Sequence, residues 1–321
     1  VGNMMQAELD IASGHEPAAV RQLTEYIARM PQSPLGYFKR GLAYSRRGDW
    51  DSAIQDLREA RQIDPEYMGG APRMVLAQAL EQNRQPDAAV TELQSLGERM
   101  PDNGTALQQL FSLYLRLKRF DSAESLIRTR SQATPNSPHW SNLRRMIAVE
   151  RQDHNAALHY ALMAAEQTGY APAALDSYLL GLLQLKRFDE LIGFVDQRLP
   201  AEHRKDAVLV RQASAYLAKG DANKGVELLM QAVHTPPVDV LVLSDLLVRD
   251  PHFKAYQDVL QQRLDTLWQG GQHGRDIRLL MGSVRRARHG FAGSGEMLRE
   301  VVGTATDETP EKAAEKMFLT R

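Results

Sequence analysis

The sequence predicts an all-α fold, a solenoid of stacked antiparallel helical hairpins with about nine repeats and part of a tenth. Three observations lead to this prediction. Apolar residues recur every three or four positions, which is typical of amphipathic helices. Small residues and prolines return at intervals of 34 residues along most of the chain. The tetrapeptide Lys-Arg-Phe-Asp occurs at 118–121 and again at 186–189, a separation of twice that interval.

The first helix of one repeat begins at Pro34, which we number as position 1. Tyr37, Gly41 and Tyr44 follow at positions 4, 8 and 11, and this spacing places them on one face of a helix. Gly48, at position 15, can adopt the left-handed conformation that ends a helix. We therefore expect the first helix to start at Pro34 and to stop at Gly48.

The second helix of this repeat has a start signal and a stop signal. Asp49 or Asp51 can cap its amino terminus. Ala53, at position 20, is small like Gly41, as two closely packed antiparallel helices require. Pro65, at position 32, cannot continue the helix. One repeat is thus predicted to be a helical hairpin.

Residues 1–237 can be divided into a regular array of such repeats. The alignment needs one insertion of two residues, near Met68. We place the repeat starts near Val1 and at Pro34, Gly70, Gly104, Pro138, Pro172 and Asp206.

Residues 238–308 keep the pattern only loosely and are interpreted as degenerate repeats. Pro251 falls where the first helix of a repeat starting near Val240 would still run, so we expect that helix to be short. The next helix should extend from Asp250 to about Gln269.

The last part of the chain begins another repeat at Arg275, whose first helix should end at Gly290. Residues 309–321 are expected to form the first helix of a truncated repeat. Because this helix has an apolar stripe that a following helix would cover, we expect the natural protein to continue past Arg321.

The segment from Gly48 to Pro65 carries Gly-Asp-Trp-Asp-x-Ala-Ile and a closing Asp-Pro, and in this it resembles the tetratricopeptide repeat. The resemblance extends over essentially the whole chain and is strongest up to Pro237. A pentatricopeptide array, which binds RNA, would lack the alanine at position 20 and the proline at position 32. Departures from the pattern are Phe111 and Arg145 at position 8, and Arg84, Lys118 and Gln152 at position 15.

The resemblance implies a right-handed superhelix whose concave groove is lined by the first helix of each repeat and binds an extended peptide or a partner helix. Groove residues would then occupy positions 2, 5, 6, 9, 12 and 13. The candidates are Phe38, Lys39, Leu42, Arg46, Met74, Gln78, Glu81, Gln108, Gln109, Ser112, Arg116, His139, Asn142 and Met146.

These candidates make a mixed groove that is apolar, amide-rich and only locally basic. The lysine, asparagine and arginine clamp of chaperone-binding relatives is missing, and so is the asparagine ladder of glycosyltransferase-attached relatives. The amides of Gln78, Gln108, Gln109 and Asn142 can hydrogen-bond a peptide backbone or simply remain solvated, and the sequence leaves both readings open.

Composition narrows the range of partners. The chain has 39 basic and 40 acidic residues, so no net field attracts nucleic acid, and we expect no nucleic-acid partner. Its apolar runs are shorter than the ~20 residues of a membrane helix, which argues against direct membrane insertion.

The absence of cysteine is compatible with the cytoplasm, which we favour, and with the periplasm. The excess of arginine over lysine favours a bacterial source.

No catalytic, metal or cofactor site is predicted. His154 and His159 are five residues apart, which does not align two ligands on one helical face. The glycines of His-Gly-Phe-Ala-Gly-Ser-Gly, from His289 to Gly295, are interpreted as a turn. The cations of Arg285–His289 are interpreted as stabilising the end of a helix.

We therefore predict a non-catalytic scaffold that binds a protein or peptide partner, whose identity the sequence leaves open. The alternative is a regulatory or substrate-recruiting arm of a longer enzyme, or of an exopolysaccharide or protein export assembly. Self-association through the open last repeat is a further expectation if the chain ends at Arg321.

Overall fold

The structure is a computed structural model that describes residues 2–204, 207–234, 240–271 and 275–289. All regular secondary structure in these ranges is helical, which confirms the all-α prediction. The chain divides into two compact bodies, Val1–Gln132 and Ala133–Arg321, here called the N-terminal and the C-terminal body. The predictions for Gly290 and for residues 309–321 lie outside the described residues.

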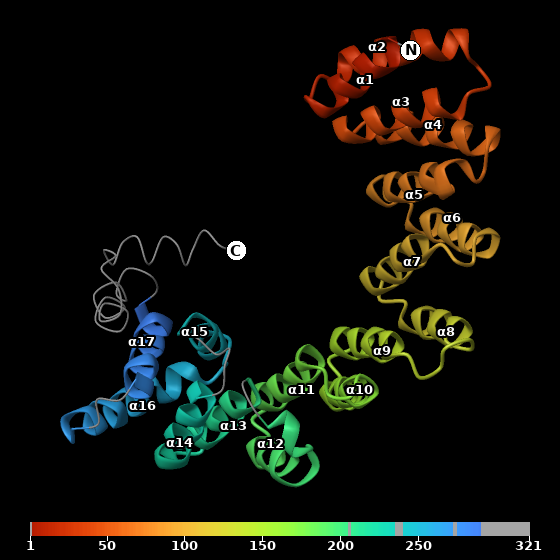
Figure 1. The fold of residues 1–321 in the computed structure, drawn as a ribbon. Helices are drawn as coiled ribbons and strands as arrows, with labels where there is room; N and C mark the ends of the chain where they lie inside the picture. The colour runs from red at the N-terminus through yellow and green to blue at the C-terminus, as the bar shows by residue number, and fades with distance from the viewer. Residues whose placement is uncertain (1, 205–206, 235–239, 272–274, 290–321) are drawn as a thin grey trace. The chain divides into compact units, whose positions relative to one another are not determined.

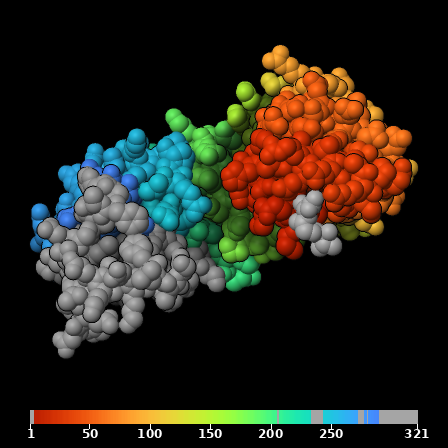
Figure 2. Space-filling view, turned by 90° about the horizontal axis from the view of Figure 1, so that it is seen from above, coloured from red at the N-terminus to blue at the C-terminus, as the bar shows by residue number. Residues whose placement is uncertain are grey.

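The N-terminal body is a stack of helical hairpins in which each helix packs on the next one along the chain (Figure 1). Figure 2 shows the side chains of its first four helices, in red and orange, packed into one continuous surface. The helices are α1 (Gly2–Ala12), α2 (Glu16–Arg29), α3 (Pro34–Arg47), α4 (Trp50–Ile63), α5 (Tyr67–Gln82), α6 (Pro86–Arg99), α7 (Gly104–Arg116) and α8 (Phe120–Arg130).

The pair α3 and α4 shows why small residues recur at two positions of the repeat. A Cβ atom built on Gly41 would lie 2.8 Å from Leu57 Cγ and 3.3 Å from the carbonyl oxygen of Ala53. Ala53 itself is completely buried. The predicted close approach of the two helices at Gly41 and Ala53 is therefore confirmed.

The turn between α3 and α4 is built as the sequence predicts. Gly48 has φ 76° and ends α3, and the side chain of Asp49 accepts a hydrogen bond from the Ser52 amide at 3.4 Å. The same left-handed conformation persists where the turn has no glycine. Its residues there are Arg84, Lys118, Gln152 and Lys186, with φ between 54° and 59°.

The two-residue insertion near Met68 takes the form of a kink at the start of α5. Met68, Gly69 and Gly70 all have positive φ, at 48°, 66° and 80°. A Cβ on Gly70 would lie 2.6 Å from Leu96 Cδ1, so only glycine fits against α6 here. The kink absorbs the extra residues, and α5 continues as a regular helix on its far side.

The C-terminal body contains further hairpins and one irregular stretch. Its elements are α9 (Pro138–Glu150), α10 (His154–Gln167), α11 (Pro172–Gln184), α12 (Phe188–Gly193), the π-helical η1 (Phe194–Arg198), the 3-10 helix η2 (Ala201–His203), α13 (Ala207–Ala218), α14 (Ala222–His234), α15 (Val240–Val248), α16 (Phe253–Gln269) and α17 (Arg275–His289).

The junction of α15 and α16 differs slightly from the prediction. Helix α16 begins at Phe253, three residues after the predicted start at Asp250. Asp250 is buried in the turn instead, where it accepts hydrogen bonds from the His252 amide at 2.9 Å and from the Tyr256 hydroxyl. The aspartate thus shapes the turn and does not begin the helix.

Candidate functional site

A pocket of about 280 Å³ opens between α5 and α7 of the N-terminal body. We call it the α5–α7 pocket. Its lining is formed by Ala77, Gln78, Glu81, Leu93, Thr105, Gln108, Gln109, Ser112, Leu113 and Arg116.

The lining combines buried apolar side chains with polar ones. Ala77 on α5, Leu93 on α6 and Leu113 on α7 are buried and line the pocket. Thr105 and Ser112 add small hydroxyl-bearing side chains.

Glu81 and Arg116 form an ion pair that joins α5 to α7 at this pocket. The guanidinium donates from Nε to Glu81 Oε1 at 2.8 Å and from Nη2 to Oε2 at 2.7 Å. The Glu81 hydrogen bond raises the pKa of Arg116 above its ordinary value. A two-point arrangement of this kind uses both carboxylate oxygens and fixes the relative orientation of the two side chains.

Three glutamines supply most of the remaining polar lining. Gln78 and Gln108 are exposed, whereas Gln109 is half-buried. Gln109 Oε1 is fully buried, and among the described residues no donor lies within hydrogen-bonding distance of it. A buried acceptor without a partner costs about 1–3 kcal/mol.

The structure brings six of the fourteen sequence candidates together in this pocket. They are Gln78, Glu81, Gln108, Gln109, Ser112 and Arg116. Met74 is half-buried on α5 but does not line the pocket. His139, Asn142 and Met146 are exposed on α9 and belong to the C-terminal body.

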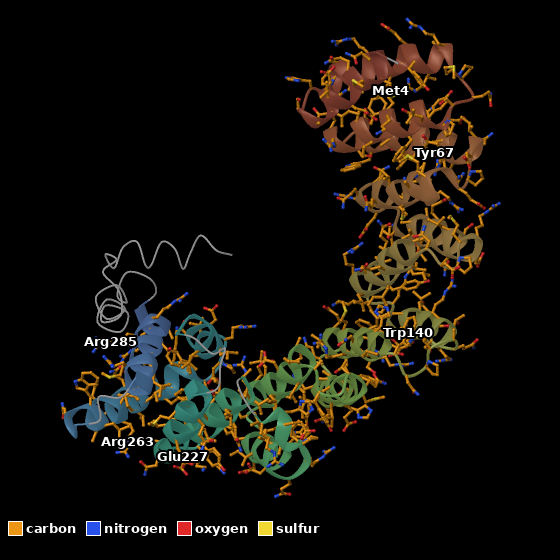
Figure 3. The ribbon with its side chains drawn as sticks, viewed as in Figure 1. Met4, Tyr67, Trp140, Glu227, Arg263 and Arg285 are labelled. Carbon is orange, nitrogen blue, oxygen red and sulfur yellow. The ribbon has the colours of Figure 1, made fainter. Side chains whose placement is uncertain are left out.

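The candidates of α3 are engaged in contacts within the N-terminal body. Phe38 was predicted to be open to a partner, but only 7% of it is exposed, and its ring packs edge-on against Tyr67 with centroids 6.4 Å apart (Figure 3 labels Tyr67). This burial corrects the prediction for Phe38: the start of α5 covers it. Leu42 is half-buried.

The two cationic groove candidates on α3 also contact other residues of the N-terminal body. Lys39 pairs with Glu8 of α1 at 2.7 Å. Arg46 donates from Nη1 to the carbonyl oxygen of Ile11, near the end of α1, at 2.6 Å. Both side chains therefore fasten α3 to the preceding repeat.

Four lining residues were not among the candidates. Thr105 stands at position 2 of its repeat, so the position rule itself could have identified it. Ala77, Leu93 and Leu113 were missed because they lie outside the predicted groove positions; all three are buried core residues that the pocket reaches. No pattern in the sequence indicates how far the pocket extends towards the core.

A smaller cavity of about 70 Å³ lies in the C-terminal body, among Tyr170, Pro172, Leu175, Asp176, Leu179, His203, Ala207 and Val208. Asp176 accepts a hydrogen bond from Arg211 Nε at 2.7 Å. Arg211 is completely buried and also donates to the carbonyl oxygen of Leu246 at 3.0 Å. Position 6 of this repeat, predicted to line a groove, is thus part of the interior.

Two further features concern the basic run of α17 and the groups that could hold a metal ion. Arg288 of the basic run near the end of α17 pairs with Asp258 at 2.7 Å. Among the described residues, no group of three or more histidine, aspartate or glutamate side chains could hold a metal ion. Within the same ranges, no helix is both long and apolar enough to cross a membrane.

Comparison with known proteins finds one repeat family. Tetratricopeptide repeat profiles match residues 4–67, 45–110 and 93–147. The small glutamine-rich tetratricopeptide repeat-containing protein 2 of Saccharomyces cerevisiae is 28% identical over 101 residues. That alignment covers 32% of this chain and 29% of the yeast protein, so it spans less than a third of that relative.

Solved structures of repeat proteins resemble the fold at low sequence identity. A tetratricopeptide repeat protein from Parabacteroides merdae is 16% identical, with 79% of this chain and 99% of that chain covered and a TM-score of 0.40. The C-terminal part of a repeat-containing protein from Cytophaga hutchinsonii is 13% identical, with coverages of 97% and 98% and a TM-score of 0.45.

Proposed function

Residues 4–147 match tetratricopeptide repeat profiles, and from this premise we propose that the chain is a non-catalytic scaffold of that repeat family that binds an extended segment of a partner protein in the α5–α7 pocket. Arrays of this kind bind through the surfaces that their stacked helices leave open. The α5–α7 pocket is one such opening, with a volume of about 280 Å³.

The observation that carries the proposal is the convergence of six predicted groove residues in one pocket. Three of them are glutamines, and each glutamine amide offers two donors and one acceptor. Each non-proline residue of a peptide backbone carries one N–H donor and one carbonyl acceptor, and a glutamine amide can bond to either. Gln78 and Gln108 are exposed, so their amides are open to the backbone of an extended segment.

The size of the pocket also favours a peptide. Sites for drug-sized ligands and cofactors usually enclose about 300–1,000 Å³. At about 280 Å³ the α5–α7 pocket is close to the lower limit of that range. It can take a side chain or two of a peptide whose backbone runs on over the neighbouring surface.

The test is a peptide-binding experiment with matched glutamine variants. An array of short uncharged peptides would be probed with the wild type, with a Gln78→Ala, Gln109→Ala double variant, and with Gln55→Ala. Gln55 is exposed on α4, outside the pocket, and controls for loss of an exposed glutamine. We expect the double variant to bind about tenfold more weakly or worse, because it lacks two hydrogen-bonding amides.

Gln55→Ala should bind as the wild type does, and circular dichroism should show unchanged helicity for both variants. Equal binding by the wild type and the double variant would contradict the proposal.

A further inference from the structure

Glu81 and Arg116 are the two ionised side chains among the ten that line the α5–α7 pocket. Each neutralises the other through two hydrogen bonds. The rest of the lining consists of amides, hydroxyls and apolar groups. The pocket therefore offers a ligand no net charge.

Arg46, at the equivalent position of an earlier repeat, shows which contact the arginine makes without a glutamate partner. Arg46 stands at position 13, as Arg116 does, but position 12 of the preceding repeat is Ile11 instead of a glutamate. Arg46 consequently donates to the Ile11 carbonyl oxygen. The carboxylate of Glu81 is thus a particular feature of the pocket and no requirement of the repeat.

The ion pair is accessible to a competing ligand. The Arg116 side chain is 55% exposed and that of Glu81 is 23% exposed. A ligand carboxylate can approach Arg116, but it would lie beside Glu81, and two adjacent carboxylates disfavour each other's ionised form. A cationic ligand that approached Glu81 would likewise lie beside Arg116, and the two positive charges would repel each other.

We propose that Glu81 sets the charge selectivity of the pocket: by neutralising Arg116 it restricts the site to uncharged peptide segments and excludes acidic ones. This inference rests on the proposed peptide-binding function. Removing the negative charge while keeping the shape should leave Arg116 free to bind a carboxylate. Glu81→Gln would then convert the pocket into a site for an acidic peptide.

The experiment uses two peptide arrays that differ in one residue. The first carries short uncharged peptides containing a glutamine, and the second carries the same peptides with that glutamine replaced by glutamate. The wild-type chain should prefer the glutamine member of each pair by about tenfold, because the glutamate carboxylate would lie beside Glu81. Glu81→Gln should lose this preference and bind the glutamate member about tenfold more tightly than the wild type does.

Two further variants make the result specific. Glu98→Gln removes the same charge from an exposed site on α6 outside the pocket and should leave the preference unchanged. The double variant Glu81→Gln, Arg116→Gln should lose the gain for glutamate peptides, because the cation that would bind them is gone. Thermal melts of all variants would show that each is folded.

The outcomes separate the two proposals. Binding by the wild type with an unchanged preference in Glu81→Gln, or an equal shift in Glu98→Gln, overturns the charge-selectivity inference and leaves peptide binding intact. No binding by any folded variant overturns the proposed function and this inference with it.

Discussion

Lys118 adopts a backbone conformation that ordinarily selects glycine. It lies in the turn between α7 and α8 with φ 54°, where the corresponding residue between α3 and α4 is Gly48. A residue with a Cβ atom is disfavoured in this conformation by about 1–2 kcal/mol. The turn survives because the amides of Lys118 and Arg119 bond to the carbonyl oxygens of Leu115 and Tyr114.

Exchanging residues at this turn position should change stability in opposite directions. We expect Lys118→Gly to raise the free energy of unfolding by up to about 1 kcal/mol, since relief of strain is partly offset by the greater freedom of glycine in the unfolded chain. Gly48→Ala should lower it by about 1 kcal/mol. Urea denaturation followed by circular dichroism measures both, and a loss of stability in Lys118→Gly would contradict the assigned strain.

The burial of Tyr178 makes the free energy of unfolding depend on pH. Burial, followed by the nearby charge of Glu190, raises its pKa to about 12. A tyrosine in the unfolded chain has a pKa of about 10, so the folded state favours the neutral hydroxyl. The stability that this provides is complete below pH 10 and is lost as the pH rises towards 12.

Tyr178→Phe should remove that part of the alkaline sensitivity. Its urea midpoint should fall less than that of the wild type when the pH is raised from about 9 to about 11.5. Similar losses in the two proteins would show that Tyr178 does not contribute. The comparison near neutral pH serves as the control, because the hydroxyl is protonated there in both folded and unfolded chains.

At the scale of the helix pair, the contact between α3 and α4 is too close for any larger side chain. Ala53 is completely buried, and its carbonyl oxygen lies near Gly41. Ala53→Leu should therefore lower the free energy of unfolding by about 1–3 kcal/mol through overpacking. Ala173→Leu, on an exposed position of α11, should have little effect. An unchanged melting curve for Ala53→Leu would contradict the assigned packing.

The helices α4, α5 and α6 are joined by a buried charge cluster. Glu92 of α6 accepts hydrogen bonds from Arg73 of α5 and from Arg61 of α4, the latter at 2.7 Å. The side chains of Arg73 and Glu92 are only 5% and 8% exposed. By contrast, Asp87 in the pair with Arg119 is 82% exposed.

Neutralising Glu92 should therefore lower the free energy of unfolding much more than neutralising Asp87. Glu92→Gln leaves Arg73 buried without its counter-ion, and we expect a loss of about 3–5 kcal/mol in the free energy of unfolding. Asp87→Asn breaks a solvent-exposed pair and should cost less than about 1 kcal/mol. Chemical denaturation of both variants checks the contrast. Equal effects would mean that burial does not set the strength of these pairs.

At the scale of the whole molecule, contacts join each repeat to the next one within a body. Side chains near the turn of one repeat bond to an acceptor about 30–35 residues earlier, as expected for a stack of nearest neighbours. Such pairs are Asn83–Asp51 and Arg119–Asp87 in the N-terminal body, and Arg187–Asn155 and Lys219–Asp189 in the C-terminal body. Stability is thus distributed along the stack.

This organisation predicts that the N-terminal body works by itself. All the lining residues of the α5–α7 pocket lie between Ala77 and Arg116, inside Val1–Gln132. A chain of residues 1–132 should therefore be helical and should bind the same uncharged peptides as the full chain, with affinities within about threefold. Circular dichroism and the peptide array measure the two properties. A folded fragment that binds no peptide would show that the pocket is not the binding site.

The sequence by itself determined the helical class and the construction of the hairpin. These features depend on neighbours within one or two helical turns: the apolar stripe of α3, the left-handed Gly48, the cap by Asp49 and the small pair Gly41 and Ala53. The spacing of residues along the chain is therefore sufficient to predict such local features. Six of the ten residues that line the α5–α7 pocket were also among the candidates predicted from the sequence.

Only the tertiary structure decided which of the predicted groove positions are open to a partner. Phe38 is covered by Tyr67, Arg211 is enclosed by contacts from Asp176 and Leu246, and Arg116 is neutralised by Glu81. Arg211 and Arg116 find their partners 35 residues away. The spacing of residues along one helix carries no information about the distance between two side chains on different helices. That distance depends on how closely the repeats stack, and the stacking is set by the size of every side chain packed between them.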